Sequence, residues 1–146
     1  MGPEDRLAGL SRIGIDTSPF IYLIEGRPDR GATAQVLFAR LAPVAKVVSV
    51  VSVIEVLTFC HAHDNHVLAQ EYRTFFRGTP EIEVVNVDWD VAEKAAEIRA
   101  VHRLFLPDAV QIATAVIAGA DAFLTNDRKF LRVKDIPVLI FDDLAL

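Results

Sequence analysis

Short runs of β-branched residues alternate with longer segments of helical period along the whole chain. Because strands joined through helices connect by right-handed crossovers, this alternation predicts an α/β fold, a single domain with three α/β/α layers around a mostly parallel central sheet. The expected strands are residues 12–16, 45–50, 82–87, 121–124 and 137–140. The expected helices are residues 18–26, 31–42, 52–62, 65–77, 88–104 and 107–119. A hydrophobic content of 52% fits such a sheet, whose strands are buried on both faces.

The size of the chain is that of one compact domain. We expect residues 1–146 to form it, with residues 1–11 as an N-terminal extension ahead of the first strand. The longest apolar stretches carry charges and fall short of the roughly 20 residues that cross a bilayer. The N-terminus has acidic residues where a secretory signal would be basic, and Cys60 is the one cysteine. We therefore expect a cytoplasmic protein without a membrane span.

Four acidic residues stand where a predicted strand has just ended or a predicted helix begins. Asp16 closes the first strand, and Glu55 lies in the first turn of the helix after the second strand. Asp108 opens a helix after "LFLP", and Asp127 follows the fourth strand in "FLTNDRKF". Ligands of an open α/β sheet bind outside the carboxyl ends of its strands. The four carboxylates are therefore expected to lie close together. Asp121 begins a strand, which puts it at the opposite edge.

Each acid also has a local explanation. Asp16 can cap the helix that follows it, and Ser52-x-x-Glu55 fits a capping box. Asp108 suits the first turn of a helix, where the helix dipole favours negative charge, and Asp127 suits a turn. For each acid taken alone, such a structural role is sufficient to explain its presence.

The surroundings of the acids favour a metal site for the set. The fragments "GID", "VIE" and "LPDA" each embed a carboxylate among apolar residues, where its charge is costly unless a cation or several donors compensate it. No basic residue lies near Asp16 or Glu55 in the sequence. Carboxylate oxygens are the ligands that Mg²⁺ and Mn²⁺ prefer. The pattern therefore indicates a site for Mg²⁺ (or Mn²⁺).

Three motifs resemble those of a known family. The stretches "IGIDTSPFIYLIEG", "SVVSVIEVL" and "PDAVQIATA…LTNDRKF" are similar to the PIN-domain ribonucleases, and most closely to the VapC-type toxins of prokaryotic toxin–antitoxin pairs. The resemblance implies a PIN-like fold and metal-dependent endonuclease cleavage of RNA. It also implies a homodimer and inhibition by an antitoxin protein. Carried over by motif, the metal-site acids are Asp16, Glu55, Asp108 and Asp127, with Thr17 and Thr125 as supporting hydroxyls.

The acidic balance of the chain is unusual for a protein that binds RNA. The formal net charge is −5, but the four proposed ligands account for four of those charges. The candidates for contacts with RNA phosphates are Arg99, Arg103, Arg128 and Lys129. An equal alternative is that Arg99 and Arg103, four apart on one predicted helix, form ion pairs with acids of that helix such as Glu93 or Glu97.

Other interpretations of the sequence are weaker. The stretch "CHAHDNH" clusters possible zinc ligands, but it lacks a second pair elsewhere, so an exposed helix end is the better interpretation. Aromatic residues at helical spacing could stack on bases, but core or dimer contacts are the better interpretation for Tyr72, Phe75, Phe76 and Trp89, and Trp89 is assigned to packing. A phosphatase of the HAD type would need a second aspartate two residues after Asp16, where Ser18 stands. The remaining alternatives are a PIN-like protein-binding module with little or no catalysis and a free-standing RNA-processing nuclease.

Overall fold

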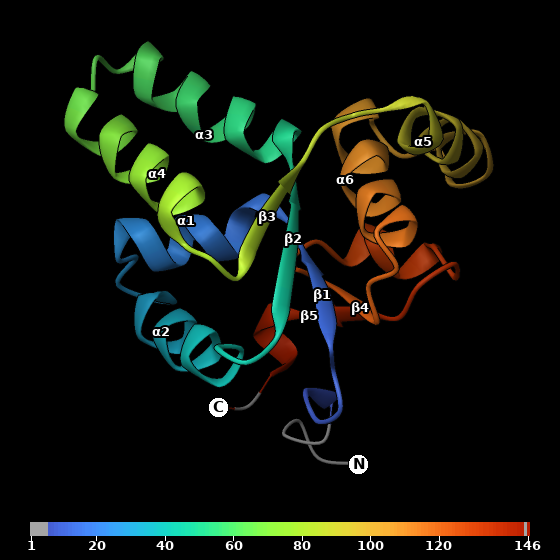
Figure 1. Cartoon of the computed structure of the whole chain (residues 1–146), viewed down its shortest axis with the longest axis horizontal. Coiled ribbons are helices and arrows are strands. Elements are labelled where there is room, and N and C mark those ends of the chain that lie inside the picture. Colours follow the sequence, from blue (N-terminus) through green and yellow to red (C-terminus); the bar gives the residue numbers. More distant parts are fainter. Residues whose placement is uncertain (1–5, 145) are drawn as a thin grey trace.

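The centre of the molecule is a five-stranded sheet in which every neighbouring pair of strands is parallel. A computed structural model describes residues 6–144 and 146 (Figure 1). The strand order is β3-β2-β1-β4-β5, so the chain starts in the middle of the sheet and builds outward in both directions. The strands are β1 (Arg12–Ile15), β2 (Ala45–Ser49), β3 (Ile82–Val85), β4 (Ala122–Thr125) and β5 (Val138–Ile140).

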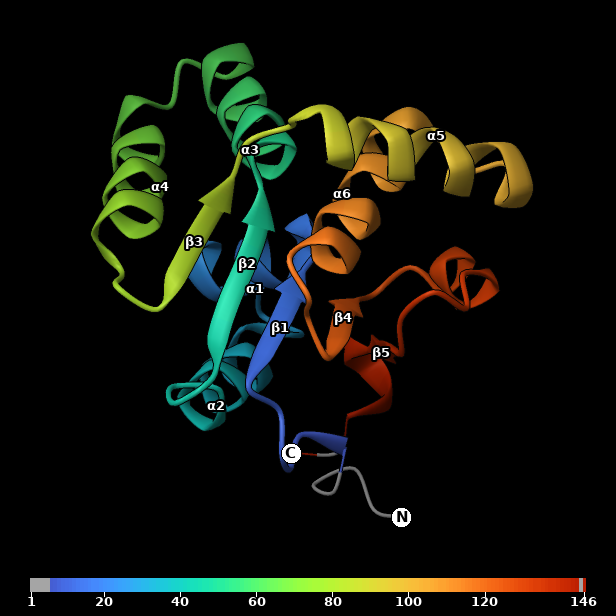
Figure 2. The same ribbon diagram turned by 45° about the vertical axis from the view of Figure 1, so that its right-hand side comes forward.

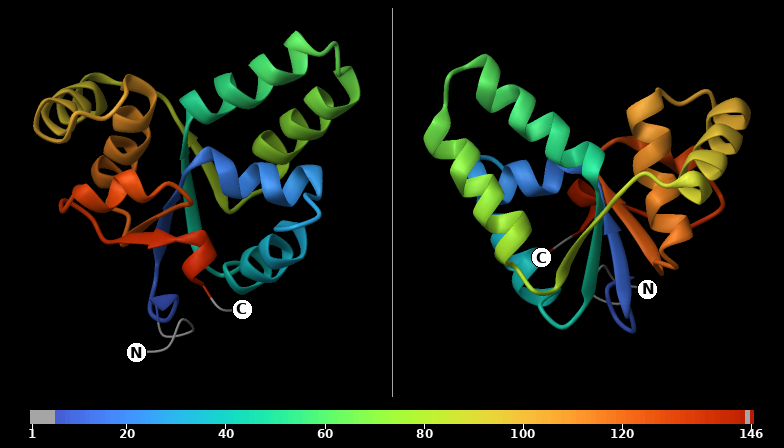
Figure 3. Two further views of the ribbon diagram at one scale, coloured as in Figure 1. Left: turned by 180° about the vertical axis from the view of Figure 1, so that it is seen from behind. Right: turned by 45° about the horizontal axis from the view of Figure 1, so that its top comes forward.

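Helices cover both faces of this sheet. The helices are α1 (Thr17–Glu25), α2 (Gly31–Arg40), α3 (Val50–Ala62), α4 (His66–Gly78), α5 (Trp89–His102) and α6 (Leu106–Ile117), with short 3₁₀ turns η2 (Arg128–Arg132) and η3 (Phe141–Asp143). The helices from α1 to α4 gather on one side of the sheet, and α5 and α6 pack together on the other (Figures 1 and 3). The predicted three-layer α/β fold with a parallel sheet is confirmed.

The boundaries of the predicted elements shift by up to two residues. The largest shifts that matter for function are at α3, which begins at Val50 instead of residue 52, and at α5, which ends at His102. The turn η2 was not expected from the sequence. Within the described residues, no helix is long and apolar enough to cross a membrane. The predicted N-terminal extension is described only from residue 6, because residues 1–5 lie outside the described part of the chain.

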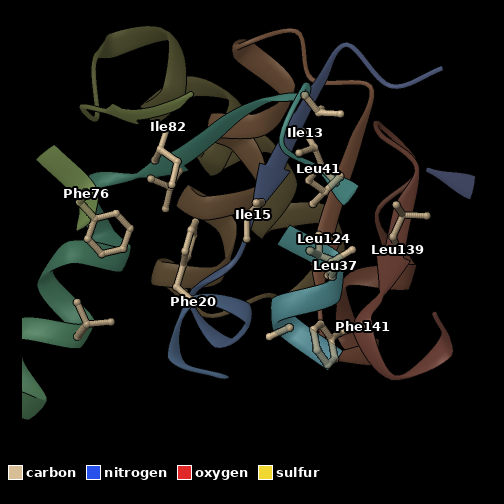
Figure 4. Packing of buried hydrophobic residues seen from close by; sticks show 14 of the residues in the cluster. Ile13, Ile15, Phe20, Leu37, Leu41, Phe76, Ile82, Leu124, Leu139 and Phe141 are labelled. Carbon is tan, nitrogen blue, oxygen red and sulfur yellow. The ribbon is translucent and has the colours of Figure 1, made fainter. Parts of the chain in front are cut away.

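Two hydrophobic clusters lie on opposite faces of the sheet and explain why the apolar strands are continuous. In the first, Phe20 of α1 packs edge-on against Phe76 of α4 with ring centroids 5.1 Å apart, and the same cluster includes Leu37 of α2 and Leu41 directly after that helix (Figure 4). The second is built by α5, α6 and η2 against the other face of the sheet. Every residue of β4 is buried, so it contributes side chains to both clusters. Because a strand between two clusters has no polar face, its sequence reads as an uninterrupted apolar run.

Aromatic residues divide between core and surface. Tyr72 and Phe76 are buried, as their helical spacing predicts. Trp89 is 78% exposed, so it does not pack in the core of this chain. The physical reason is its place as the first residue of α5, where the side chain lies outside the stripe of Val91, Ala95 and Ile98 that this helix buries.

Gly14 sets the distance between β1 and α6. A Cβ atom added to Gly14 would overlap the side chain of Ala115 on α6 and lie 3.3 Å from the ring of Phe123. The close approach of helix and strand therefore depends on a residue without a side chain.

We predict that Gly14→Ala lowers the free energy of unfolding by about 1–3 kcal/mol, because the added methyl group must push α6 away from the sheet. The measurement is urea unfolding followed by circular dichroism. Gly78→Ala is the matched control, since nothing lies within 4 Å of the atom that it adds. Equal stability of Gly14→Ala and the wild type would contradict the packing of α6 on β1.

Candidate metal centre

Asp16 lies at the carboxyl end of the central strand. Its backbone N–H donates to the carbonyl of Leu124 at 2.9 Å, which extends the pairing of β1 and β4 by one residue. The carboxyl ends of β1, β2 and β3 point toward the start of α3 (Figure 2). One oxygen of Asp16 accepts from the N–H of Thr17 at 2.8 Å, and the other accepts from Thr125 Oγ1 at 2.7 Å. Asp16 therefore caps α1 and is also held in place by β4.

The electrostatic surroundings of Asp16 disfavour its charge. Only 8% of the residue is exposed, and this burial is the largest cause that raises the pKa of its carboxyl to about 6. The hydrogen bonds from Thr125 and Thr17 oppose the increase, while the charges of Asp108 and Glu55 add to it. Asp16, Asp108 and Glu55 therefore place negative charge at the carboxyl ends of the strands, and each of these charges repels the others.

Glu55 reaches this site from the second turn of α3. The hydroxyl of Ser49, the last residue of β2, accepts from the N–H of Val51 at 3.1 Å and caps the helix. The capping box predicted for Ser52 and Glu55 is therefore wrong, because the helix already begins at Val50. Ser52 is fully buried, and its hydroxyl lies 2.9 Å from Thr17 Oγ1.

A buried amide that the sequence interpretation missed holds Glu55. Thr17 Oγ1 donates to Glu55 Oε1 at 2.9 Å, and Gln111 Nε2 donates both to that carboxylate oxygen and to Thr17 Oγ1. Gln111 is 3% exposed, and its own Oε1 has no hydrogen-bond partner within the described residues. A glutamine inside the apolar run "AVQIATAV", one helical turn after Asp108, was the available signal.

Asp108 and Asp127 face each other across a lysine. Lys129 Nζ lies 3.7 Å from Asp108 Oδ2 and 3.3 Å from Asp127 Oδ2. Asp127 also caps η2 by accepting from the N–H of Lys129 at 2.9 Å, and its own N–H donates to Thr125 Oγ1 at 3.1 Å. Burial raises the pKa of Asp108, Lys129 lowers it, and the charge of Asp127 raises it again. Thr125 thus links Asp127 to Asp16 through one hydroxyl.

The four acids are neighbours but form two pairs. Asp16 and Glu55 are both held by Thr17, Asp16 through its backbone N–H and Glu55 through its hydroxyl, whereas Asp108 and Asp127 share Lys129. Over residues 6–144 and 146, no three His, Cys, Asp or Glu side chains are arranged so that they could hold a metal ion as they stand. The donor set still fits Mg²⁺ or Mn²⁺ chemically, since it consists of carboxylate and hydroxyl oxygens around a carboxyl whose charge is uncompensated.

The histidine-rich stretch forms the end of α3 and the turn into α4. His61, His63 and His66 are exposed, and His63 Nδ1 lies 2.9 Å from the carbonyl of Phe59 one turn earlier. The structure confirms the interpretation of this stretch as an exposed helix end. At the other edge of the sheet, Asp121 accepts the backbone N–H groups of Ser11 and Arg12, far from the metal-site acids as predicted.

The four candidates for RNA contacts differ in their surroundings. Arg128 pairs with Asp143 at 2.6 Å, and Lys129 bridges the two acids already described. Glu97 pairs with Lys94 at 3.3 Å, and within the described residues neither Arg99 nor Arg103 forms the alternative ion pair with Glu93 or Glu97. Arg103 also lies outside the helix, because its φ of 56° places it in the left-handed region at the end of α5.

Comparison with known families identifies the fold. The sequence profile of the PIN domain matches residues 13–136. The chain belongs to the PIN-domain family. The match begins within β1 and spans all the acids of the candidate metal centre. The family predicted from the motifs is therefore confirmed. No curated protein matches the chain.

Solved structures of toxin–antitoxin proteins share this PIN fold. A toxin–antitoxin complex from Klebsiella pneumoniae is 23% identical with a TM-score of 0.67, and the match covers 90% of this chain and 98% of that chain. VapBC2 from Rickettsia felis, bound to a DNA fragment from its promoter, is 16% identical with a TM-score of 0.70 over 88% and 98%. VapC20 from Mycobacterium tuberculosis, a toxin that cleaves the sarcin–ricin loop, is 24% identical with a TM-score of 0.65 over 77% and 87%.

The raised pKa of Asp16 predicts how the stability of the metal-free protein depends on pH. A folded carboxyl with a raised pKa binds its proton more tightly than the unfolded chain does, so the free energy of unfolding falls as pH rises from about 4 to 6. Asp16→Asn removes this contribution. When pH rises from 4 to 7, we expect the free energy of unfolding of the variant to increase by roughly 1–3 kcal/mol relative to that of the wild type.

The measurement is urea unfolding of both proteins in metal-free buffer at the two pH values. Asp90→Asn is a control, because Asp90 is an exposed residue in the first turn of α5. A constant difference in stability between the wild type and Asp16→Asn at both pH values would contradict the raised pKa.

Proposed function

We propose that this chain is a metal-dependent endoribonuclease that hydrolyses RNA phosphodiesters through a four-carboxylate site for Mg²⁺ or Mn²⁺. The observation that carries the proposal is the state of Asp16. It is a buried carboxyl at the carboxyl edge of the sheet, and its pKa is raised both by burial and by the nearby charges of Asp108 and Glu55. Such an arrangement suits a dication, because a dication removes the repulsion that the acids impose on one another.

Each acid has a proposed role at the site. Asp16 and Asp108 would hold the metal directly, and Glu55 and Asp127 would complete the site directly or through water. When bound, a dication lowers the pKa of a coordinated water and neutralises negative charge on phosphate oxygens. Thr125 fixes the orientation of Asp16 through its 2.7 Å hydrogen bond, and Thr17 does the same for Glu55.

Lys129 has two uses in this proposal. In the structure its ammonium compensates Asp108 and Asp127. Its side chain is partly exposed, so it can turn from the acids toward a phosphate once a dication takes over their charge. Arg99, Arg103 and Arg128 are the other proposed phosphate contacts, and Arg128 must first leave Asp143.

The solved structures that share the fold support one of the proposed partners, an antitoxin protein. Complexes with an antitoxin are among the structures that share the fold, which supports a toxin role with a cognate antitoxin protein, and we propose a homodimer as well. One observation favours a second candidate, a PIN-like protein-binding module with little catalysis. Lys129 already compensates two of the four acids, and a protein without a metal requirement would have this arrangement.

We predict cleavage of RNA oligonucleotides by the purified chain in Mg²⁺ or Mn²⁺, and its loss when EDTA removes the metal. Asp16→Asn should lower the rate of cleavage at least about 100-fold, because it removes a carboxylate that is proposed to bind the metal directly. Rates are measured by gel electrophoresis of labelled RNA.

Asp90→Asn should cleave at the wild-type rate, since it removes the same charge from an exposed position outside the site. Cleavage that persists in Asp16→Asn would assign the activity to another site or another protein. Absence of cleavage by the wild type with both metals and a broad set of RNAs would favour the binding module.

A further inference from the structure

The helices α5 and α6 pack side by side (Figures 1 and 2). A hollow of about 440 Å³ lies where α5 ends and the chain turns into α6, and we name it the α5–α6 hollow. Apolar residues, two arginines and one aromatic residue line it. The residues that line it are Ala96, Arg99, Ala100, Arg103, Leu104 and Phe105.

Arg103 occupies a backbone position that favours glycine. Its φ is 56°, and its N–H donates to the carbonyl of Arg99 at 2.8 Å to close α5. A side chain at such a position costs free energy that glycine avoids. Within the described residues, neither the guanidinium of Arg103 nor that of Arg99 forms an ion pair or a hydrogen bond. No polar contact within the described residues explains an arginine at this position, which points to a ligand.

Phe105, two residues after Arg103, is also an unusual residue for its position. It is the N-cap of α6, a position where Ser, Thr, Asp or Asn would accept a backbone N–H, and it provides no side-chain cap. It is also 71% exposed, so it does not contribute to the core. The ring neither caps α6 nor enters the core, so it is available to bind a ligand.

The α5–α6 hollow lies one side chain away from the candidate metal centre. Lys129 Nζ is 5.0 Å from the centroid of the Phe105 ring and 3.7 Å from Asp108 Oδ2. Asp108 itself stands three residues after Phe105, in the first turn of α6. A molecule in the hollow would therefore be adjacent to a phosphate at the acids.

We propose that the α5–α6 hollow binds one unpaired nucleotide of an RNA strand whose neighbouring phosphate lies at the metal centre, an inference that rests on the proposed function. The base stacks on the ring of Phe105, and the phosphate pairs with Arg99 and Arg103. Guanidinium groups match phosphate oxygens, and exposed rings stack on unpaired bases without regard to sequence. An apolar protein segment fits less well, because it would cover two guanidinium groups without supplying a counter-charge.

The test measures binding separately from cleavage. Fluorescence anisotropy gives the Kd of the full chain for a labelled single-stranded RNA in EDTA, where no metal-dependent cleavage occurs. Phe105→Ala should raise the Kd about tenfold and leave binding to duplex RNA unchanged, because duplex RNA offers no free base face. Phe105→Tyr should bind like the wild type, since its ring still stacks.

Arg103→Gly separates the ligand role from a structural one. It should weaken binding and lower the slope of log K against log salt by about 0.7, the value for one lost phosphate contact on a single strand. Its thermal stability should equal or exceed that of the wild type, because glycine suits the left-handed position. If Arg103 had only a structural role, Arg103→Gly would lower the thermal stability and leave RNA binding unchanged.

Two matched controls set the baseline. Arg77→Gln removes an exposed positive charge from α4, on the other side of the sheet, and Trp89→Ala removes an equally exposed ring at the far end of α5. Binding by Phe105→Ala and Arg103→Gly that matches these controls would overturn the proposal, and so would a wild type that does not bind single-stranded RNA. Failure to cleave RNA in Mg²⁺ or Mn²⁺ would instead overturn the proposed endoribonuclease activity, whatever the binding result.

Discussion

The burial of the Asp16 carboxyl at the end of β1 is the constraint around which the functional edge of this protein is organised. The residue closes the central strand, begins α1 through the N–H of Thr17, and is fixed by Thr125 from the adjacent strand. Burial is the largest cause of the raised pKa of this carboxyl, and the charges of Asp108 and Glu55 add to it. The two interpretations of Asp16, helix cap and metal ligand, are therefore compatible, because separate oxygens and lone pairs can serve each role.

Compensation of charge explains why the acids stand as two pairs. Lys129 lies between Asp108 and Asp127, while Glu55 is held by neutral donors from Thr17 and Gln111. Neutral donors orient a carboxylate without cancelling its charge, so the pair of Asp16 and Glu55 remains the more negative. In our proposal Asp16, Glu55, Asp108 and Asp127 would hold a dication, and its charge would replace that of Lys129 beside Asp108 and Asp127. Lys129, which lies beside the ring of Phe105, would then be free to contact a phosphate.

Much of the fold could be predicted from the sequence because the strands lie between two hydrophobic clusters and read as apolar runs. The start of α3 was misjudged because two serines offered caps. Ser49 caps the helix, since it stands where the strand ends, and Ser52 is left to bind Thr17. Gln111 had no local signature, and its partners Thr17 and Glu55 lie 94 and 56 residues away. The environments of Arg103 and Phe105 depend on how α5 turns into α6, which helical periodicity does not encode.

The central claim is that the four carboxylates assemble around one small dication. A crystal structure of the chain grown with Mn²⁺, with anomalous scattering recorded to locate the ion, tests it most directly. The account predicts a manganese peak about 2.1 Å from oxygens of Asp16 and Asp108, with Lys129 Nζ moved away from Asp108. A map without a manganese peak beside Asp16, in which Lys129 still bridges Asp108 and Asp127, would contradict it.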